Sequence, residues 1–134
     1  MKTSANANLA LASSYAKNER YALALRHYQT AAQLDKTSAT AHAGIAFVHR
    51  KQGRLSAALR AAQQAVALDA EDGDVQYELA CVLARLGRIK EAMAALEKAV
   101  ELDSDLAEWL PDEPDLKPLA QLPAFKKLLP TENK

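Results

Sequence analysis

The sequence predicts an all-α fold made of three similar helical hairpins in tandem, followed by capping helices. The first observation is a repeat, because the segments NERYALALRHYQTAAQLD, QGRLSAALRAAQQAVALD and LGRIKEAMAALEKAVELD begin at residues 18, 52 and 86, a constant spacing of 34 residues. The second is composition: Ala and Leu are abundant, and no alternating run rich in Val, Ile and Thr indicates strands. The third is length, since 134 residues with 49% hydrophobic content can bury one modest core.

Each repeat divides into two helical segments. Apolar and small residues recur three, four or seven positions apart along each segment, which is the spacing of one helical face. The two segments meet at residues 18–19, at Gly53 and at Gly87, where a short turn must reverse the chain. We therefore expect a single domain over residues 1–134, with helical hairpins at residues 5–38, 39–72 and 73–106.

Alanine occupies the same positions in all three repeats. Small side chains let helices approach closely, so a bulky replacement would lower stability by roughly 1–3 kcal/mol through overpacking. One hairpin cannot cover its own apolar face, so the hairpins are expected to stack. The recurring columns are Leu11, Ile45 and Leu79; Ala12, Ala46 and Ala80; Tyr21, Leu55 and Ile89; Ala24, Ala58 and Ala92; Tyr28, Ala62 and Leu96; and Ala31, Ala65 and Ala99.

This pattern resembles the tetratricopeptide repeat, which has a large apolar and a small residue on its first helix and alanines on its second. The resemblance covers residues 5–106 as three tandem repeats. It implies a right-handed superhelical array in which the first helix of each hairpin lines a concave groove. The chain departs from the family pattern where Trp is usual (Asn8, His42, Gln76), where Gly is usual (Ala12, Ala46, Ala80) and where Pro usually ends the repeat (Lys36, Ala70, Ser104).

Residues 107–130 are expected to form a carboxy-terminal cap. Helix can continue to Leu110, and residues 113–129 then place leucines and Phe125 at helical spacings, with Pro118 and Pro123 marking breaks or helix starts. The segment is similar to the closing sequence of many bacterial repeat arrays, a P-D-L stretch followed by P-x-F-x-x-L. A terminal repeat needs such a cap to cover its apolar face, although a detachable segment that folds into the groove is the alternative.

Charge and cysteine content limit the classes of partner. The formal net charge is zero, so we expect neither a nucleic acid nor an anionic membrane as partner. No apolar run approaches the roughly 18 residues of a membrane span, and the amino terminus is interpreted as part of the first helix, not as a signal sequence. The single cysteine, Cys81, cannot form an internal disulfide, and we expect a cytoplasmic protein.

The sequence contains no recognisable catalytic constellation. Glycine-rich phosphate loops, HExxH, paired-cysteine metal motifs and nucleophile elbows are absent, so we expect no enzymatic activity, no cofactor and no metal site. His42 and His49 lie seven residues apart on one helix, but two histidines that bind one metal ion usually lie closer along a helix and are joined by a third ligand. His49 is expected to be a core residue and His27 a surface residue.

The best-known ligands of the resembled family are peptides that end in carboxylates, held by a clamp of Lys, Asn and Arg. At the five positions that correspond to the clamp, this chain has Leu9, Ser13, Gly44, Asp74 and Glu78, and none of them matches. An acidic carboxylate tail is therefore not the expected ligand, and the last two residues would repel it.

Two surfaces are candidate binding sites. In the groove, Phe47 and Tyr77 would supply apolar anchors, with Glu78 and Arg85 to orient polar groups, unless the two aromatics only pack between repeats. Cations recur around the turn inside each hairpin, where they stabilise the end of the first helix and would also suit an anionic partner. The predicted groove residues are Leu9, Ser13, Ala43, Phe47, Arg50, Tyr77, Glu78, Cys81 and Arg85, and the predicted basic edge is Lys17, Arg20, Lys51, Arg54 and Arg88.

The expected function is non-catalytic binding of a peptide or protein segment in the groove, as a scaffold, an adaptor or a small chaperone. Weak self-association is an alternative, because residues 1–72 carry nine Lys/Arg and five Asp/Glu, whereas residues 73–134 carry eight and twelve. A regulatory tetratricopeptide domain of a larger protein is a third hypothesis. The repeat fold supports many partners, so it names none of them.

Overall fold

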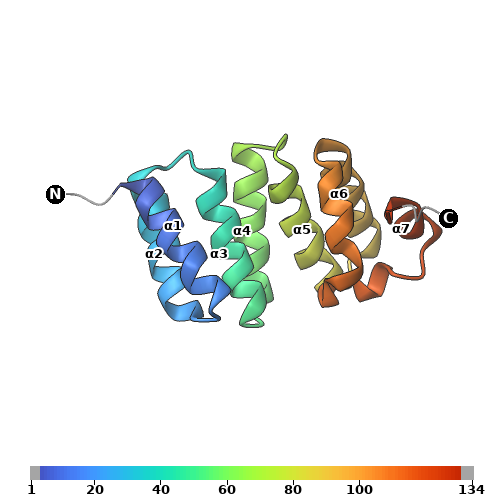
Figure 1. Cartoon of the computed structure of the whole chain (residues 1–134), viewed down its shortest axis with the longest axis horizontal. Coiled ribbons are helices and arrows are strands. Elements are labelled where there is room, and N and C mark those ends of the chain that lie inside the picture. The colour runs from blue at the N-terminus through green and yellow to red at the C-terminus, as the bar shows by residue number, and fades with distance from the viewer. Residues whose placement is uncertain (1–3, 131–134) are drawn as a thin grey trace. The chain divides into compact units, whose positions relative to one another are not determined.

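The computed structural model describes residues 4–130, and within this range every regular element is helical. The predicted all-α fold class is confirmed (Figure 1). Six α-helices fall where the 34-residue period places them, and two 3₁₀-helices and a short α-helix follow. The elements are α1 (Ala5–Lys17), α2 (Tyr21–Leu34), α3 (Ala39–Lys51), α4 (Leu55–Leu68), α5 (Gly73–Arg85), α6 (Ile89–Leu102), η1 (Ser104–Asp112), η2 (Pro114–Leu119) and α7 (Pro123–Leu128).

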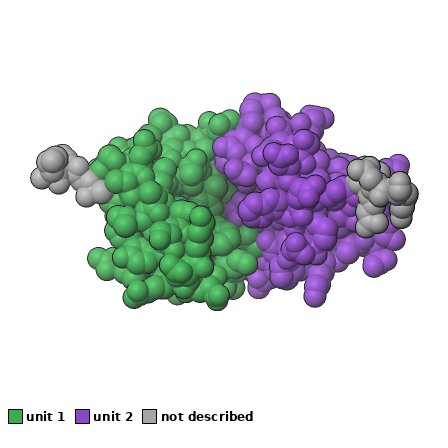
Figure 2. Space-filling model, viewed as in Figure 1, with its two compact units in different colours: residues 1–69 green, residues 70–134 purple. Residues whose placement is uncertain are grey.

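The chain forms two compact units, shown in different colours in Figure 2. Unit 1 (Met1–Asp69) contains α1 to α4, and unit 2 (Ala70–Lys134) contains α5, α6, η1, η2 and α7. In unit 1, α1 packs against α2, α2 against α3 and α3 against α4. In unit 2, α5 packs against α6, and the segments after α6 pack on both helices.

Local residues determine where the first helix of each hairpin begins and where the chain turns after it. The first helix of each hairpin begins after a capping residue, Ser4, Ser38 or Asp72, whose side-chain oxygen accepts a hydrogen bond from a backbone N–H of the first turn at 2.9–3.1 Å. These three residues are again 34 apart, so the capping positions follow the same period as the apolar columns. The turns inside the hairpins use left-handed backbone at Gly53 and Gly87, each with φ +78°.

The alanine columns form the cores, as predicted. Ala12, Ala46 and Ala80 on the first helices are fully buried, and so are the two alanine columns on the second helices. In unit 1, the Tyr28 ring lies directly against Gly44, where a Cβ atom would collide with it. The buried alanines of the second helices are Ala24, Ala58 and Ala92, and Ala31, Ala65 and Ala99.

The cap of unit 2 is built mainly from 3₁₀-helix, where the sequence suggested further α-helical turns. Pro111 lies inside η1, and Pro114 begins η2 while Pro118 lies within it; proline lacks the N–H that an extended α-helix requires. The expected apolar side chains still point inward. Leu106, Leu110, Leu116, Leu119 and Phe125 are buried against α5 and α6.

Candidate functional site

Six of the nine predicted groove residues keep at least part of their side chain exposed. Leu9 and Ser13 lie on α1, Ala43 and Phe47 on α3, and Tyr77 and Arg85 on α5; Arg85 is exposed and the others are half-buried. All of them therefore lie on the first helix of a hairpin, as the helical phase predicted. Their role in binding a partner stays a prediction.

The other three predicted groove residues are buried, which corrects their expected exposure. Arg50 is 1%, Glu78 7% and Cys81 0% exposed. In unit 2, α6, η1 and η2 pack against α5, and Cys81 of α5 is fully buried. In unit 1, the Arg50 guanidinium lies 5.4 Å from the centre of the Phe47 ring. These three side chains cannot contact a partner directly in this conformation.

Phe47 takes part in the packing of unit 1. Its ring lies edge-on to Tyr21 of α2, with 6.5 Å between ring centres, and it rests on the core cluster formed by α1, α2 and α3. The Lys51 ammonium lies 5.6 Å from the same ring. Phe47 is therefore a structural residue with a partly exposed surface, so a substitution there tests folding as well as binding.

Tyr77 lies in a surface pocket of unit 2 with a volume of about 310 Å³. The other lining residues come from η1 and its carboxyl end: Glu108, Trp109, Asp112 and Glu113. Trp109 is the only tryptophan of the chain and is 65% exposed, far more than is usual for so large an aromatic side chain. The sequence predicted that these four residues belong to the cap, but not that they line a candidate binding site. The one available signal is the stretch EWLPDE, in which the only Trp is surrounded by acidic residues.

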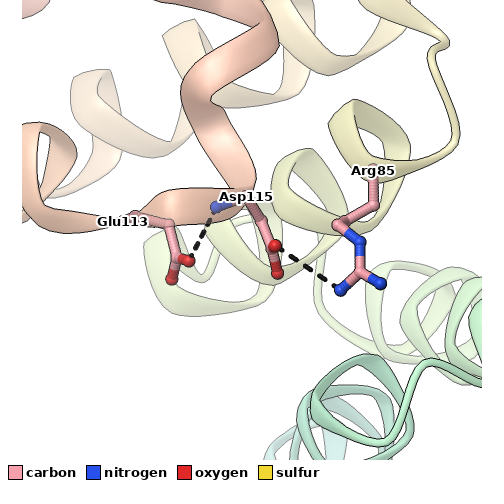
Figure 3. Close-up of polar contacts among 3 residues, drawn as sticks. All are labelled: Arg85, Glu113 and Asp115. Carbon is pink, nitrogen blue, oxygen red and sulfur yellow. Dashed lines mark hydrogen bonds and ion pairs between the residues drawn. The ribbon is translucent and has the colours of Figure 1, made fainter.

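Arg85 connects α5 to the cap. Its Nη1 atom lies 3.5 Å from Asp115 Oδ1 in η2, and Glu113 Oε2 accepts a hydrogen bond of 3.1 Å from the Asp115 backbone N–H (Figure 3). Glu113 thus caps η2 while also lining the Tyr77 pocket. The predicted polar groove residue Arg85 is engaged with the cap of its own unit.

The predicted basic edge consists of exposed side chains at the hairpin turns. Lys17, Arg20, Lys51, Arg54 and Arg88 are all exposed. Several of them have local contacts: Arg20 lies 5.8 Å from the Tyr15 ring centre, and Arg88 forms two hydrogen bonds of 2.8 Å to Glu91, which raise the pKa of its guanidinium. A role for this edge in binding an anionic partner stays a prediction.

The histidines pack differently from the expectation. His27, expected at the surface, is half-buried: Nδ1 donates to Asn8 Oδ1 at 2.9 Å, and the ring stacks on Tyr15 at 5.5 Å. His49, expected to be a core residue, is half-buried, and its buried Nδ1 atom has no hydrogen-bond partner among the described residues. Partial burial, followed by the charges of Arg54 and Arg60, lowers the pKa of His49.

Residues 4–130 were considered as a possible metal-binding or membrane-spanning region, with the following result. No group of three or more His, Cys, Asp or Glu side chains is arranged to hold a metal ion. No helix in this part of the chain has the length and apolar character needed to cross a membrane.

Comparisons with known families decide the identity of the repeat. A family model described as Tetratricopeptide repeat matches residues 45–107, and a second, described as TPR repeat, matches residues 12–53. The chain belongs to the tetratricopeptide repeat family. The matches cover the predicted hairpins except for the first turns of α1. A search of curated proteins found no match.

Solved tetratricopeptide repeat (TPR) structures share the fold. The Arabidopsis OM64 TPR domain is 18% identical, with a TM-score of 0.71 over 92% of this chain and 93% of that one. The Yersinia enterocolitica type III secretion translocator chaperone SycD is 18% identical, with a TM-score of 0.69 over 92% and 90%. The second TPR of Spaghetti (RPAP3), bound to the HSP90 peptide SRMEEVD, is 21% identical, with a TM-score of 0.70 over 75% and 94%. At these identities the likeness concerns the fold alone.

Proposed function

We propose that this chain is a non-catalytic protein-interaction module that binds a peptide or protein segment on the exposed faces of its first helices, as a scaffold, an adaptor or a small chaperone. The observation that carries the proposal is the Tyr77–Trp109 pocket, where a largely exposed tryptophan borders a concave surface on a TPR unit. Large aromatic side chains at such positions supply much of the binding energy in protein interfaces. The similar structures of SycD, a chaperone, and of Spaghetti, bound to a peptide, agree with this class of function.

The acidic peptide that the Spaghetti TPR binds is not the expected ligand here. The corresponding clamp positions include Asp74, whose pKa is raised by partial desolvation and by the neighbouring charges of Asp72 and Asp103. A carboxylate of the peptide placed beside Asp74 would add to the repulsion among these acidic side chains. The peptide SRMEEVD therefore serves as a negative control in binding experiments, and saturable binding of it would contradict this part of the proposal.

Site-specific photo-crosslinking tests the proposal. A photoreactive amino acid replaces Tyr77 in one variant and Leu34, an exposed residue of α2, in the control. We expect a partner from the source cell to crosslink at position 77 and not at position 34, and the purified partner to bind the parent chain and lose affinity for Tyr77→Ala, with folding checked by circular dichroism. Equal crosslinking at both positions, or binding that Tyr77→Ala leaves unchanged, would contradict it.

A further inference from the structure

The pocket in unit 2 combines aromatic and acidic side chains in a way that selects one kind of ligand. Tyr77 on α5 and Trp109 on η1 provide two aromatic rings, and Glu108, Asp112 and Glu113 provide three carboxylates around a volume of about 310 Å³. Among the described residues, neither Glu108 nor Asp112 forms an ion pair or a side-chain hydrogen bond. The concave surface thus presents negative charge and aromatic faces together.

We propose that this pocket binds a cationic side chain, Lys or Arg, from a segment of a partner protein. An ammonium or guanidinium group is attracted both to the face of an aromatic ring and to carboxylates, and the stem of either side chain can lie against the exposed indole. A metal ion is not favoured, because the carboxylates in this part of the chain do not converge as a ligand set. The inference rests on the proposed function, since it names the partner chemistry at one part of the same surface.

A second copy of this chain is the competing source of cations. Its basic edge is exposed, with Arg20, Lys51 and Arg54 among its members. Such a contact would join two different surfaces, the basic edge of one copy and the pocket of another. The formal net charge of the chain is zero, so two copies have no overall electrostatic attraction for each other. We assign the pocket to a different protein and treat self-association as a distinct outcome of the test.

Tryptophan fluorescence gives a direct readout, because Trp109 is the only tryptophan. The first probe is a pentapeptide with two arginines whose amino and carboxyl ends are blocked, so that the arginines carry its only charges. The second probe is the same peptide with two citrullines, which keep the shape of arginine without its charge. We expect the arginine peptide to change Trp109 emission saturably, with an affinity that falls as salt is raised, because exposed charges are screened. The citrulline peptide should produce little change.

Paired variants separate the pocket from the net charge of the chain. Glu108→Gln/Asp112→Asn should weaken binding of the arginine peptide about three- to tenfold, the size expected for two exposed ion pairs. Glu97→Gln/Glu101→Gln removes the same charge from exposed positions of α6 outside the pocket and should leave the affinity unchanged.

Three results would overturn the inference: an equal response to both peptides, no response to either, or the same effect of the two double variants. Emission that changes with protein concentration alone, and is restored by Glu108→Gln/Asp112→Asn, would assign the pocket to a second copy and overturn its assignment to another protein.

If a partner crosslinks at position 77 while the arginine peptide gives no response, the proposed function stands and the cation inference fails. If the peptide binds but no partner crosslinks there, the proposed function fails.

Discussion

Asn8 Oδ1 lies 2.9 Å from His27 Nδ1 and joins α1 to α2 within unit 1. The Asn8 side chain is only 3% exposed, and its Nδ2 also donates to Ser4 O at 3.0 Å. Because the family usually has Trp at this position, a polar pair here takes the place of apolar packing. The hydrogen bonds offset the desolvation of a buried amide.

Replacing Asn8 should therefore destabilise unit 1. Asn8→Ala removes both hydrogen bonds and leaves the His27 ring nitrogen without this partner, so we expect a loss of about 1–3 kcal/mol in the free energy of unfolding. Asn6→Ala is the matched control, because Asn6 is exposed on the same helix and gains the same helix propensity. Urea unfolding followed by circular dichroism measures both. Equal effects of the two substitutions would show that the buried bonds contribute nothing.

Gly44 should not tolerate a methyl group. An alanine in mid-helix normally stabilises by about 1 kcal/mol relative to glycine. Here the added Cβ would collide with the Tyr28 ring, so Gly44→Ala should instead destabilise unit 1 by about 1–3 kcal/mol. The sign of the change in thermal or urea unfolding is diagnostic. In a double-mutant cycle with Tyr28→Ala, the two losses should be less than additive, and full additivity would argue against the contact.

Glu19 occupies the turn position that Gly53 and Gly87 hold in the other hairpins, with φ +60°. A side chain in left-handed backbone costs roughly 1–2 kcal/mol, part of which the greater entropy of unfolded glycine offsets. We expect Glu19→Gly to stabilise unit 1 by about 0.5–1 kcal/mol. Glu19→Ala controls for the loss of charge and should give no such gain. A similar gain in both variants would assign the effect to the charge.

The repeat period predicted the hairpins because each helix repeats the same apolar columns, and because Gly53 and Gly87 mark the turns. It did not predict the form of the cap, where closely spaced prolines favour 3₁₀-helix over the α-helix that the leucine spacing suggested. Helical phase placed Glu78 and Cys81 on a first helix, but it carries no information on how far neighbouring segments cover that face. Their burial therefore required the structure.

The pocket was not predictable for a similar reason. Tyr77 and Trp109 are separated by 32 positions and belong to different kinds of element, so no periodicity relates them. They meet because η1 turns back onto the third hairpin. The composition of EWLPDE marks an unusual segment, yet only the fold brings it beside α5.

His49 should make the stability of unit 1 depend on pH. Its pKa is lowered by partial burial and then by Arg54 and Arg60, so folding favours the neutral ring and the unfolded chain binds more protons. The stabilisation is present above the unfolded-state pKa of about 6.5 and is lost as the pH falls from there through the lowered folded-state value. Urea unfolding at about pH 7.5 and about pH 5 should show a smaller decline for His49→Gln than for the parent. An equal decline in both proteins would contradict the assignment, and NMR titration of the His49 ring checks the direction of the shift.

The most direct test of the central claim is NMR shift mapping of the labelled chain with the partner fragment identified by crosslinking. The account predicts that the perturbed signals cluster at Tyr77 and at Glu108, Trp109, Asp112 and Glu113, around the pocket of unit 2. Perturbations confined to the second helices α2, α4 and α6, with the Trp109 indole signal unchanged, would contradict it.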